Sequence, residues 1–340
     1  MQFRTIVETA PSRRAISYAT PGLSLGSCFA ENIAARMQRA KFPLVSNPFG
    51  VLYNPASIAS AIELLAAGAE FDDSGLVRDG DLWSSFRFHG SFSSADPSEA
   101  LARMNGSVAA GAEALRRAEY VLITFGTAWV YELSEEFHRD FPPTDAAGGS
   151  PFPEGGVVAN CHKFPSRYFH RRRMEVGEIE ELYSRLIEGG ALVGKQVVLT
   201  VSPVRHMKDG AAANGVSKAT LILAASHLAA RYDNVEYFPG YEIVNDELRD
   251  YRFYAADMAH PSPVAVDYIW ERFSSSFFRE DTLRTMASVE KIAAAAEHRP
   301  LNPASPSHAE FRRSMLRRIE ELAALHPGID LSAEAAFFAD

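Results

Sequence analysis

Residues 22–39 read GLSLGSCFAENIAARMQR, an apolar run of strand length followed at once by a helical pattern. The first four residues, GLSL, are apolar enough for a buried strand, and Gly26-Ser27 follows as a turn. Apolar side chains then recur every three or four residues, at Ala30, Ile33, Ala34 and Met37. A strand that turns directly into an amphipathic helix predicts the start of a βαβ unit.

The same alternation continues along the chain. Apolar runs of strand length occur at residues 42–45, 120–125, 196–201 and 235–238. Helical patterns lie among them, at residues 56–67, 98–118, 175–188, 217–231 and 263–278. Apolar strands that alternate with helices predict an α/β fold with a parallel sheet covered on both faces. Because ligands bind outside the carboxyl ends of such strands, the residues that follow each strand are the candidates for function.

Two regions depart from this alternation. Residues 138–173 are rich in Pro and Gly and are too long for an ordinary connection, so we expect an inserted flap. Residues 281–340 are mostly helical, and the period of residues 309–325 predicts one docked amphipathic helix. We therefore expect one α/β domain over residues 1–280, which includes the flap, and a helical C-terminal extension over residues 281–340.

Composition narrows the classes of function. The 340 residues are 47% hydrophobic and 23% charged, as in ordinary globular proteins, and the net charge is -9. An acidic chain lacks the basic surface of a nucleic-acid binder and the polybasic segment of a protein that binds anionic membranes. Two cysteines cannot form a disulfide scaffold, and no apolar stretch has the length of a signal peptide core or a transmembrane helix. We expect a soluble, cytoplasmic protein with neither nucleic acid nor membrane as a partner.

Ser27 follows the first strand and precedes the first helix. A serine there can expose its hydroxyl at the sheet edge, where the free N–H groups of the helix's first turn can stabilise an oxyanion. The alternative is that Ser27 only caps the helix, a role that serine often fills. Its neighbour Cys28 is a rival nucleophile, because a helix N-terminus lowers the pKa of a thiol, or else it packs as a small buried hydrophobe.

Asp257 and His260 lie three residues apart in DMAHPS, just before the helix at residues 263–278. Asp257 can fix the tautomer of His260, which can then act as a general base toward a serine. The order Ser, Asp, His along the chain is one of several that such triads use. The alternative is a capped loop that carries a surface histidine.

Other polar groups lie after the remaining strands and in the flap. The candidates for oxyanion or substrate binding are Gly50, Gly126, Thr127, Asn160, His162, Arg205 and His206. Gly50 can offer a backbone N–H to an anion. Arg249 and Arg252 could clamp a carboxylate or phosphate, although nearby acidic residues are their more usual partners. Cys28, Cys161, His162 and His206 could form a zinc site, but the paired spacing of zinc sites is absent, so we expect no metal and no cofactor.

Several blocks of the chain together resemble the GSCFA family. Gly26-Ser27-Cys28-Phe29-Ala30 is the signature that names the family, and the further blocks are SNPFGVLYNP (46–55), ITFGTAWVY (123–131), VANCHK (158–163), TVSPVRH (200–206) and LRDYRFYAADMAHPS (248–262). The family is regarded as related to the SGNH, or GDSL-like, hydrolases. That kinship implies a flavodoxin-like, three-layer α/β/α fold with a parallel five-stranded sheet. It also implies an ester-hydrolysing site in which Ser27, Asp257 and His260 match the catalytic positions.

Two blocks depart from the hydrolase pattern. The first reads Gly-Ser-Cys where the hydrolases have Gly-Asp-Ser, so a strict column match puts Cys28 at the nucleophile. Ser27 is still preferred, because it directly follows the glycine that ends the strand and suits attack assisted by histidine. Another reads Gly126-Thr127-Ala128 where the superfamily has Gly-x-Asn, so the asparagine of the oxyanion hole is missing. We expect Thr127, or Asn160 and His162 from the flap, to replace it.

The resemblance implies an esterase that acts on a carbohydrate ester or a small acyl ester such as acetyl. Ser27 attacks the carbonyl, His260 accepts the proton, and N–H groups near Ser27 and Gly50 hold the oxyanion of the intermediate. An O-acyltransferase that passes the acyl group to a glycan hydroxyl is the first alternative. The missing asparagine leaves a second alternative, a non-catalytic module that binds a carbohydrate or a protein partner.

Overall fold

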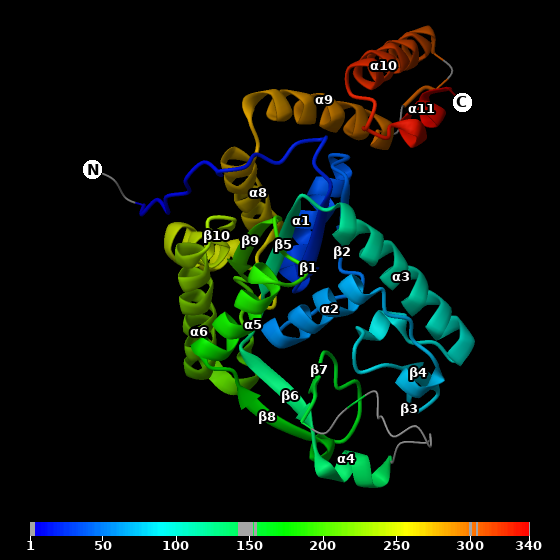
Figure 1. Ribbon diagram of the computed structural model, residues 1–340. Coiled ribbons are helices and arrows are strands. Elements are labelled where there is room, and N and C mark those ends of the chain that lie inside the picture. Colours follow the sequence, from blue (N-terminus) through cyan, green and yellow to red (C-terminus); the bar gives the residue numbers. More distant parts are fainter. Residues whose placement is uncertain (1–3, 142–151, 153–154, 299–300, 304, 340) are drawn as a thin grey trace.

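The computed structural model describes residues 4–141, 152, 155–298, 301–303 and 305–339. At its centre lies a sheet of five parallel strands in the order β2-β1-β5-β9-β10 (Figure 1). These strands are β1 (Gly22–Gly26), β2 (Leu44–Ser46), β5 (Tyr120–Phe125), β9 (Gln196–Val201) and β10 (Val235–Phe238). The sequence predicts a strand at each of these places, and the parallel pairing of all five confirms the α/β fold.

Helices cover both faces of the sheet. On one face lie α1 (Cys28–Arg39) and α8 (Pro263–Phe277), and on the other lie α2 (Pro55–Ala67), α3 (Pro97–Arg117), α5 (Val176–Glu188) and α6 (Gly210–Arg231). The strand residues divide between the faces with a period of two: Val121 and Ile123 pack with the second set of helices, Tyr120 and Leu122 with the first. Both faces are therefore buried, which explains why the strands are uninterrupted apolar runs and confirms the three-layer architecture.

Most helix boundaries agree with the predicted ones, and α6 is the main exception. It begins at Gly210, well before the predicted helix at residues 217–231. Its first residues, GAAANGV, carry no apolar periodicity that would mark a helix. A short helix, α7 (Gly240–Glu242), and a π-helical turn at Ile243–Leu248 follow β10.

Between β5 and α5 the chain forms a second sheet, which is antiparallel. Its strands are β6 (Trp129–Leu133), β7 (Val157–Val158) and β8 (Phe169–Arg173), and α4 (Glu135–Asp140) follows β6. The insertion thus begins earlier, and is more regular, than the flap predicted for residues 138–173. Residues 142–151 and 153–154 of that flap lie outside the described residues. A small hairpin of β3 (Val77–Asp79) and β4 (Leu82–Ser84) precedes α3.

The C-terminal part of the chain consists of α9 (Glu280–Glu297), α10 (Pro306–Leu325) and α11 (Ser332–Ala339), which pack mainly on one another (Figure 1). Of the four apolar residues in the predicted period of residues 309–325, Met315, Ile319 and Leu322 are buried in α10, whereas Phe311 is exposed. Lys41, which follows α1, forms an ion pair of 2.7 Å with Glu334 of α11 and so ties these helices to the α/β part. Of the helices in the described part of the chain, none is long and apolar enough to cross a bilayer.

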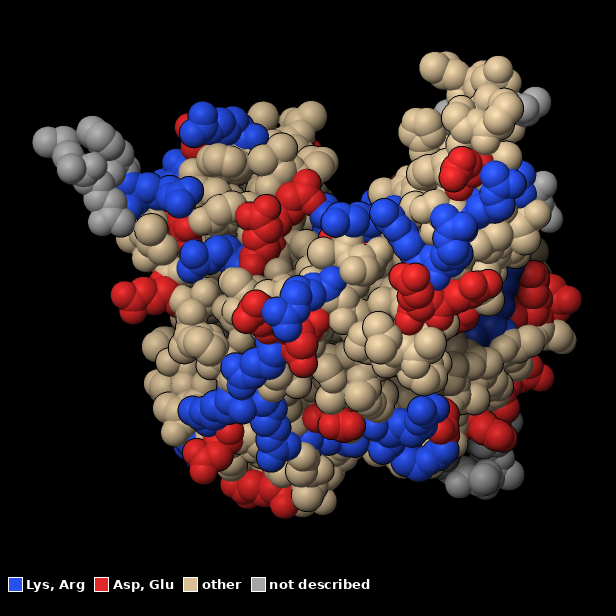
Figure 2. Space-filling model, turned by 90° about the horizontal axis from the view of Figure 1, so that it is seen from above, with Lys and Arg blue, Asp and Glu red and all other residues tan. Residues whose placement is uncertain are grey.

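Charged side chains of both signs are interspersed on the surface. Figure 2 shows Lys and Arg beside Asp and Glu across one face of the molecule. The ion pair of 2.6 Å between Arg39 and Glu297 is one exposed example. Because an exposed pair contributes at most about 1 kcal/mol, the stability of the fold comes mainly from the two apolar layers against the sheet.

The carboxyl ends of β1, β5 and β9 lie side by side. Gly26 pairs with Thr124, and Phe125 pairs with Val201, so Ser27, Gly126 and Ser202 follow at the same edge of the sheet, as predicted. The turns there approach closely. A Cβ on Gly126 would lie 2.9 Å from the carbonyl oxygen of Tyr53 and 3.3 Å from the Cβ of Ser27, so only glycine fits.

Candidate active site

A cavity of about 550 Å³ opens at this edge of the sheet. Its walls come from the strand ends, from the antiparallel insertion and from the loop that carries His260. All the predicted site residues except Gly50 and Asp257 line it: Ser27, Cys28, Gly126, Thr127, Asn160, His162, Arg205, His206 and His260. Its volume lies in the range of about 300–1,000 Å³ that small-molecule sites have.

Ser27 occupies the N-cap position of α1, but its side chain does not cap the helix. The residue is 1% exposed, and its hydroxyl has no hydrogen-bond partner among the described residues. The hydrogen bond from Ser27 to His260 that a Ser-His-Asp triad uses is therefore not formed in this structure. Behind the turn, Oδ1 of Asn47 accepts the N–H of Gly26 at 2.9 Å and holds the end of β1.

Cys28 is the first residue of α1, is half-buried and lines the cavity. Burial and the negative charge of Glu31 raise the pKa of its thiol. The backbone N–H groups of Phe29 and of Cys28 itself, together with the positive charge of Lys218, act in the opposite direction without reversing the shift. The resting thiol is therefore protonated, so a nucleophilic attack by Cys28 requires a base in the same cavity.

Asp257 and His260 form a tightly closed pair. Oδ1 of Asp257 accepts the N–H groups of Ala259 at 2.9 Å and of His260 at 3.0 Å, and Oδ2 lies 2.6 Å from Nδ1 of His260. Because an ionised carboxylate only accepts, Nδ1 carries the proton and Nε2 is left to exchange one. The hydrogen bonds from His260 and Ala259 lower the pKa of Asp257 to about 2, so the carboxylate stays charged and orients the imidazole.

Lys218 is a candidate that the sequence analysis does not single out. The residue is 1% exposed, and its Nζ donates to the carbonyl oxygens of Gly126 at 2.7 Å and Ser202 at 2.6 Å, directly behind the strand ends. Within the described residues it has no carboxylate partner, and burial lowers its pKa to about 7. Lys218 lies on the buried, apolar stripe of α6 with Leu221 and Ala225. A lysine among the apolar residues of a helix is unusual, and this is the sequence feature that could have identified it.

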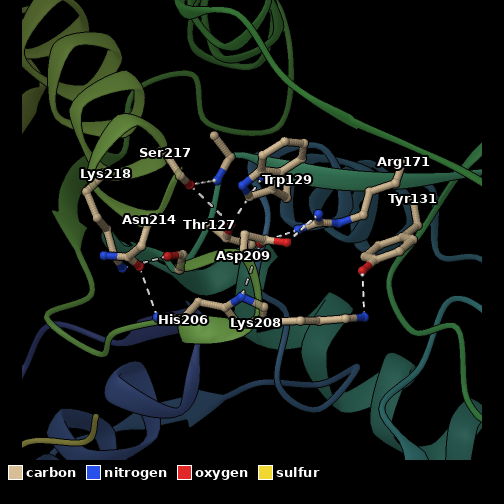
Figure 3. A network of polar contacts seen from close by, with 12 residues as sticks. Thr127, Trp129, Tyr131, Arg171, His206, Lys208, Asp209, Asn214, Ser217 and Lys218 are labelled. Carbon is tan, nitrogen blue, oxygen red and sulfur yellow. Dashed lines mark hydrogen bonds and ion pairs between the residues drawn. The ribbon is translucent and has the colours of Figure 1, made fainter. Parts of the chain in front are cut away.

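Two of the N–H groups expected near an oxyanion are engaged elsewhere. The backbone N–H groups of Gly126 and Thr127 both donate to the carbonyl oxygen of Tyr53, at 2.8 and 2.9 Å. The Thr127 hydroxyl lies 3.2 Å from that of Ser217 and accepts the N–H of Trp129 at 3.2 Å (Figure 3). Thr127 therefore fixes the turn after β5, although it also lines the cavity.

The prediction that Gly50 contributes an oxyanion donor is wrong. Gly50 does not line the cavity, and its N–H donates to the carbonyl oxygen of Asn47 at 2.7 Å in a turn where Gly50 has a φ of 75°. In the insertion, Oδ1 of Asn160 accepts the N–H of His162 at 2.8 Å, and Nε2 of His162 lies 2.8 Å from the carbonyl oxygen of Ser85. These contacts hold the insertion loop against the cavity, and they leave the amide nitrogen of Asn160 as its side-chain donor.

The insertion adds an aromatic and cationic wall that the sequence analysis misses. The guanidinium of Arg171 lies 4.1 Å from the ring centroid of Trp129 and 5.3 Å from that of Tyr131. It also binds both carboxylate oxygens of Asp209, at 2.6 and 2.5 Å, while Nζ of Lys208 lies 3.2 Å from the Tyr131 hydroxyl (Figure 3). The sequence FHRRR of β8 has no apolar run, so Arg171 has no signal in the sequence beyond its place within the predicted flap.

Arg205 and His206 line the cavity from the segment after β9. The N–H of Arg205 donates to the carbonyl oxygen of Ala259 at 3.1 Å, which joins this segment to the loop of His260. Burial lowers the pKa of His206, whose Nδ1 lies 3.8 Å from Asp209.

Two further arginines that could clamp an anion do not reach the cavity. Arg249 lines a separate, smaller cavity, and Arg252 lies 3.8 Å from Asp250.

The alternative of a zinc site finds no support in the geometry. Within the described ranges, no group of three or more His, Cys, Asp or Glu side chains could hold a metal ion. Cys28 and Cys161 are both free thiols.

The fold and the site together define a class of protein: a three-layer α/β protein with a His-Asp pair and a Ser-Cys turn at the carboxyl edge of a parallel sheet. The chain belongs to the GSCFA family, whose model matches residues 22–273. A second model, the C-terminal domain of GSCFA domain proteins, matches residues 289–340. The family predicted from the sequence blocks is thereby confirmed. Neither a curated protein nor a solved structure matches this chain.

Proposed function

We propose that the protein transfers acyl groups from an ester, with a nucleophile at the β1–α1 turn and His260 as general base. The observation that carries this proposal is the contact of 2.6 Å between Asp257 and Nδ1 of His260, in a loop that opens on the cavity lined by Cys28 and Ser27. A carboxylate that fixes a histidine beside a nucleophile is the arrangement of many acyl-transfer enzymes.

Three observations support Cys28, and not Ser27, as the nucleophile. The Cys28 residue is half-buried at the cavity, whereas the Ser27 hydroxyl is enclosed and has no partner. The backbone N–H groups of Cys28 and Phe29, at the start of α1, favour the thiolate of Cys28 and so lower its pKa, against the larger effect of burial. Cys28 also occupies the nucleophile's column when Gly-Ser-Cys is matched strictly to Gly-Asp-Ser.

In the proposed reaction, Nε2 of His260 takes the proton of the Cys28 thiol while Sγ forms a bond to the ester carbonyl carbon. The N–H groups of Cys28 and Phe29 stabilise the resulting oxyanion. When the carbon–oxygen bond of the ester breaks, His260 returns the proton to the leaving alkoxide, and a thioester on Cys28 remains. Water or a sugar hydroxyl then attacks the thioester, gives its proton to His260, and the thiol is regenerated.

The acyl-enzyme is the direct test. After incubation with p-nitrophenyl acetate, intact-mass and peptide mass spectrometry are expected to find one acetyl group on Cys28. Cys28→Ala is expected to lose both the adduct and the turnover, while the matched variant Cys161→Ala keeps them. An acetyl group on Ser27 that persists in Cys28→Ala would refute the assignment and return the chemistry to the serine predicted from the sequence.

The same assay separates hydrolysis from transfer. With a methyl glycoside present, a transferase forms an acetylated glycoside at the expense of free acetate, and a hydrolase releases acetate alone.

A second candidate, a carbohydrate-binding module without catalysis, is favoured by one observation: the N–H groups of Gly126 and Thr127 are bound to Tyr53 and are lost to an oxyanion. The absence of any acyl adduct or turnover in the wild-type protein would select this candidate.

A further inference from the structure

The charge of the cavity wall has one sign. The charged side chains that line it are Arg171, Arg205 and Lys208, beside the imidazole rings of His162, His206 and His260, and no Asp or Glu lines it within the described residues. The chain as a whole has a net charge of -9, so this distribution runs against its average composition. Like charges that line a concave site concentrate their field inside it and attract ligands of the opposite charge.

From this wall we infer that the substrate is an anion: a sugar-sized acyl ester that carries a carboxylate or a phosphate. The inference rests on the proposed function for the acyl group and adds the class of molecule that carries it. The anion is bound by Arg205 and Lys208, and the body of the substrate lies against Trp129 and Tyr131.

Arg171 does not supply a positive charge that could bind the anion. Its guanidinium is neutralised by the two-point contact with Asp209, whose pKa it lowers. Arg171 instead fixes the wall, since it lies over Trp129 and near Tyr131.

Arg205 and Lys208 are different, because neither forms an ion pair with a described carboxylate. The closest partners of Arg205 are neutral: its Nη2 lies 3.5 Å from Oδ1 of Asn245, and its guanidinium lies 5.3 Å from the ring centroid of Tyr254. Lys208 contacts the Tyr131 hydroxyl at 3.2 Å. Neither charge therefore has a carboxylate at ion-pair distance, although Lys208 does lower the pKa of its neighbour Asp209 through its charge. The backbone hydrogen bond from Arg205 to Ala259 keeps Arg205 next to the loop of His260.

Binding of unacylated ligands tests this inference without any turnover. Isothermal titration calorimetry of the full chain compares methyl glucuronide, glucose 6-phosphate and the neutral methyl glucoside. At least one of the two anionic sugars is expected to bind about tenfold more tightly than the neutral one, because charged hydrogen bonds are the stronger ones. The comparison of the carboxylate with the phosphate identifies which anion the site takes. The preference is expected to weaken when salt is raised.

Arg205→Gln combined with Lys208→Gln is expected to abolish the preference. Arg252→Gln, which removes one positive charge outside the cavity, is the matched control and is expected to keep it. If the double variant does not fold, the single variants decide, and Arg205→Lys is expected to retain the preference that Arg205→Gln reduces. Equal affinity for all three sugars, binding of none, or a preference that survives the double substitution would overturn the inference.

These outcomes are independent of the catalytic proposal. A protein that binds anionic sugars but forms no acyl-enzyme would contradict the proposed function and leave the anionic site standing. A protein that cleaves neutral esters with no preference for anionic ligands would do the reverse.

Discussion

Replacing Lys218 by methionine removes the buried cation behind the strand ends and keeps the length of the side chain. In the folded protein, burial lowers the pKa of Lys218 to about 7, whereas a lysine in an unfolded chain titrates near 10.4. Between these two values the unfolded chain holds a proton that the folded protein has released. The free energy of unfolding that Lys218 contributes must therefore rise with pH across this window, and it is lost as the pH falls through 7.

The expected magnitude follows from the window. A difference of one bound proton between the unfolded and folded states changes the free energy of unfolding by about 1.4 kcal/mol per pH unit. At pH 7 only half of the folded molecules have released the Lys218 proton, so the contribution of Lys218 to the free energy of unfolding grows by about 2 kcal/mol between pH 7 and pH 9. Lys218→Met lacks this contribution, and all other titrating groups are shared with the wild type. The difference in free energy of unfolding between the two proteins should therefore change by about 2 kcal/mol over these two units, in favour of the wild type.

Urea denaturation at pH 7, 8 and 9, followed by tryptophan fluorescence, measures this difference. Lys291→Met removes an exposed lysine of α9 and serves as the matched control, with a difference that is expected to stay constant. The absolute stability of Lys218→Met does not enter the test, because the variant also leaves the carbonyl oxygens of Gly126 and Ser202 without a donor. A constant difference between wild type and Lys218→Met would refute the reasoning and mean that the two carbonyl groups keep the ammonium charged up to pH 9.

Three further predictions concern the site. Asp257→Asn should lower kcat about 10²–10⁴-fold in the nitrophenyl acetate assay. In the wild-type protein the pKa of Asp257 is about 2, so any loss of rate that begins above pH 4 must come from the protonation of another group. Gly126→Ala should cost roughly 1–3 kcal/mol in urea denaturation, because its Cβ would lie 2.9 Å from a backbone oxygen; an unchanged midpoint would show that the turn yields freely. Ser27→Cys combined with Cys28→Ala moves the thiol one residue along the chain and should remain inactive, since position 27 is enclosed; recovery of activity would contradict the proposed orientation.

The layers of the fold are predictable from the sequence because both faces of the central sheet are buried. Each of its strands is then an apolar run, and the alternation with helices leaves few other arrangements. The insertion is not predictable in the same way. β8 reads FHRRR, and its arginines are only partly buried, because they pair with acidic side chains such as Glu132 and Asp209 instead of an apolar core. Neither a period of two nor an apolar run marks such a strand.

The candidate site, like the fold, is predictable from the sequence only in part. That Ser27, Gly126 and Ser202 meet at one edge follows from strand polarity alone, and so does the position of the cavity. Which way each side chain points does not follow from polarity. The place of Lys218 on a buried stripe can be read from the helix predicted at residues 217–231, whereas its contact with the strand ends cannot.

Ser27 and Cys28 both line the cavity, but the Ser27 hydroxyl is enclosed whereas Cys28 is only half-buried, and this difference has one cause. Ser27 has extended backbone angles, with φ -70° and ψ 174°, and its Cβ lies so close to the turn after β5 that glycine is required at position 126. The chain becomes helical at the next residue, so the side chain of Cys28 leaves the backbone in a different direction and lines the cavity. A small residue fits the first position, where β1 and β5 approach closely, and the nucleophile that we propose stands at the second. The preference for Ser27 on sequence grounds assumed that the hydroxyl next to the glycine is open to the cavity. Ser27 does line the cavity, but its hydroxyl is enclosed, and the close packing between β1 and β5 argues against its attack on a substrate.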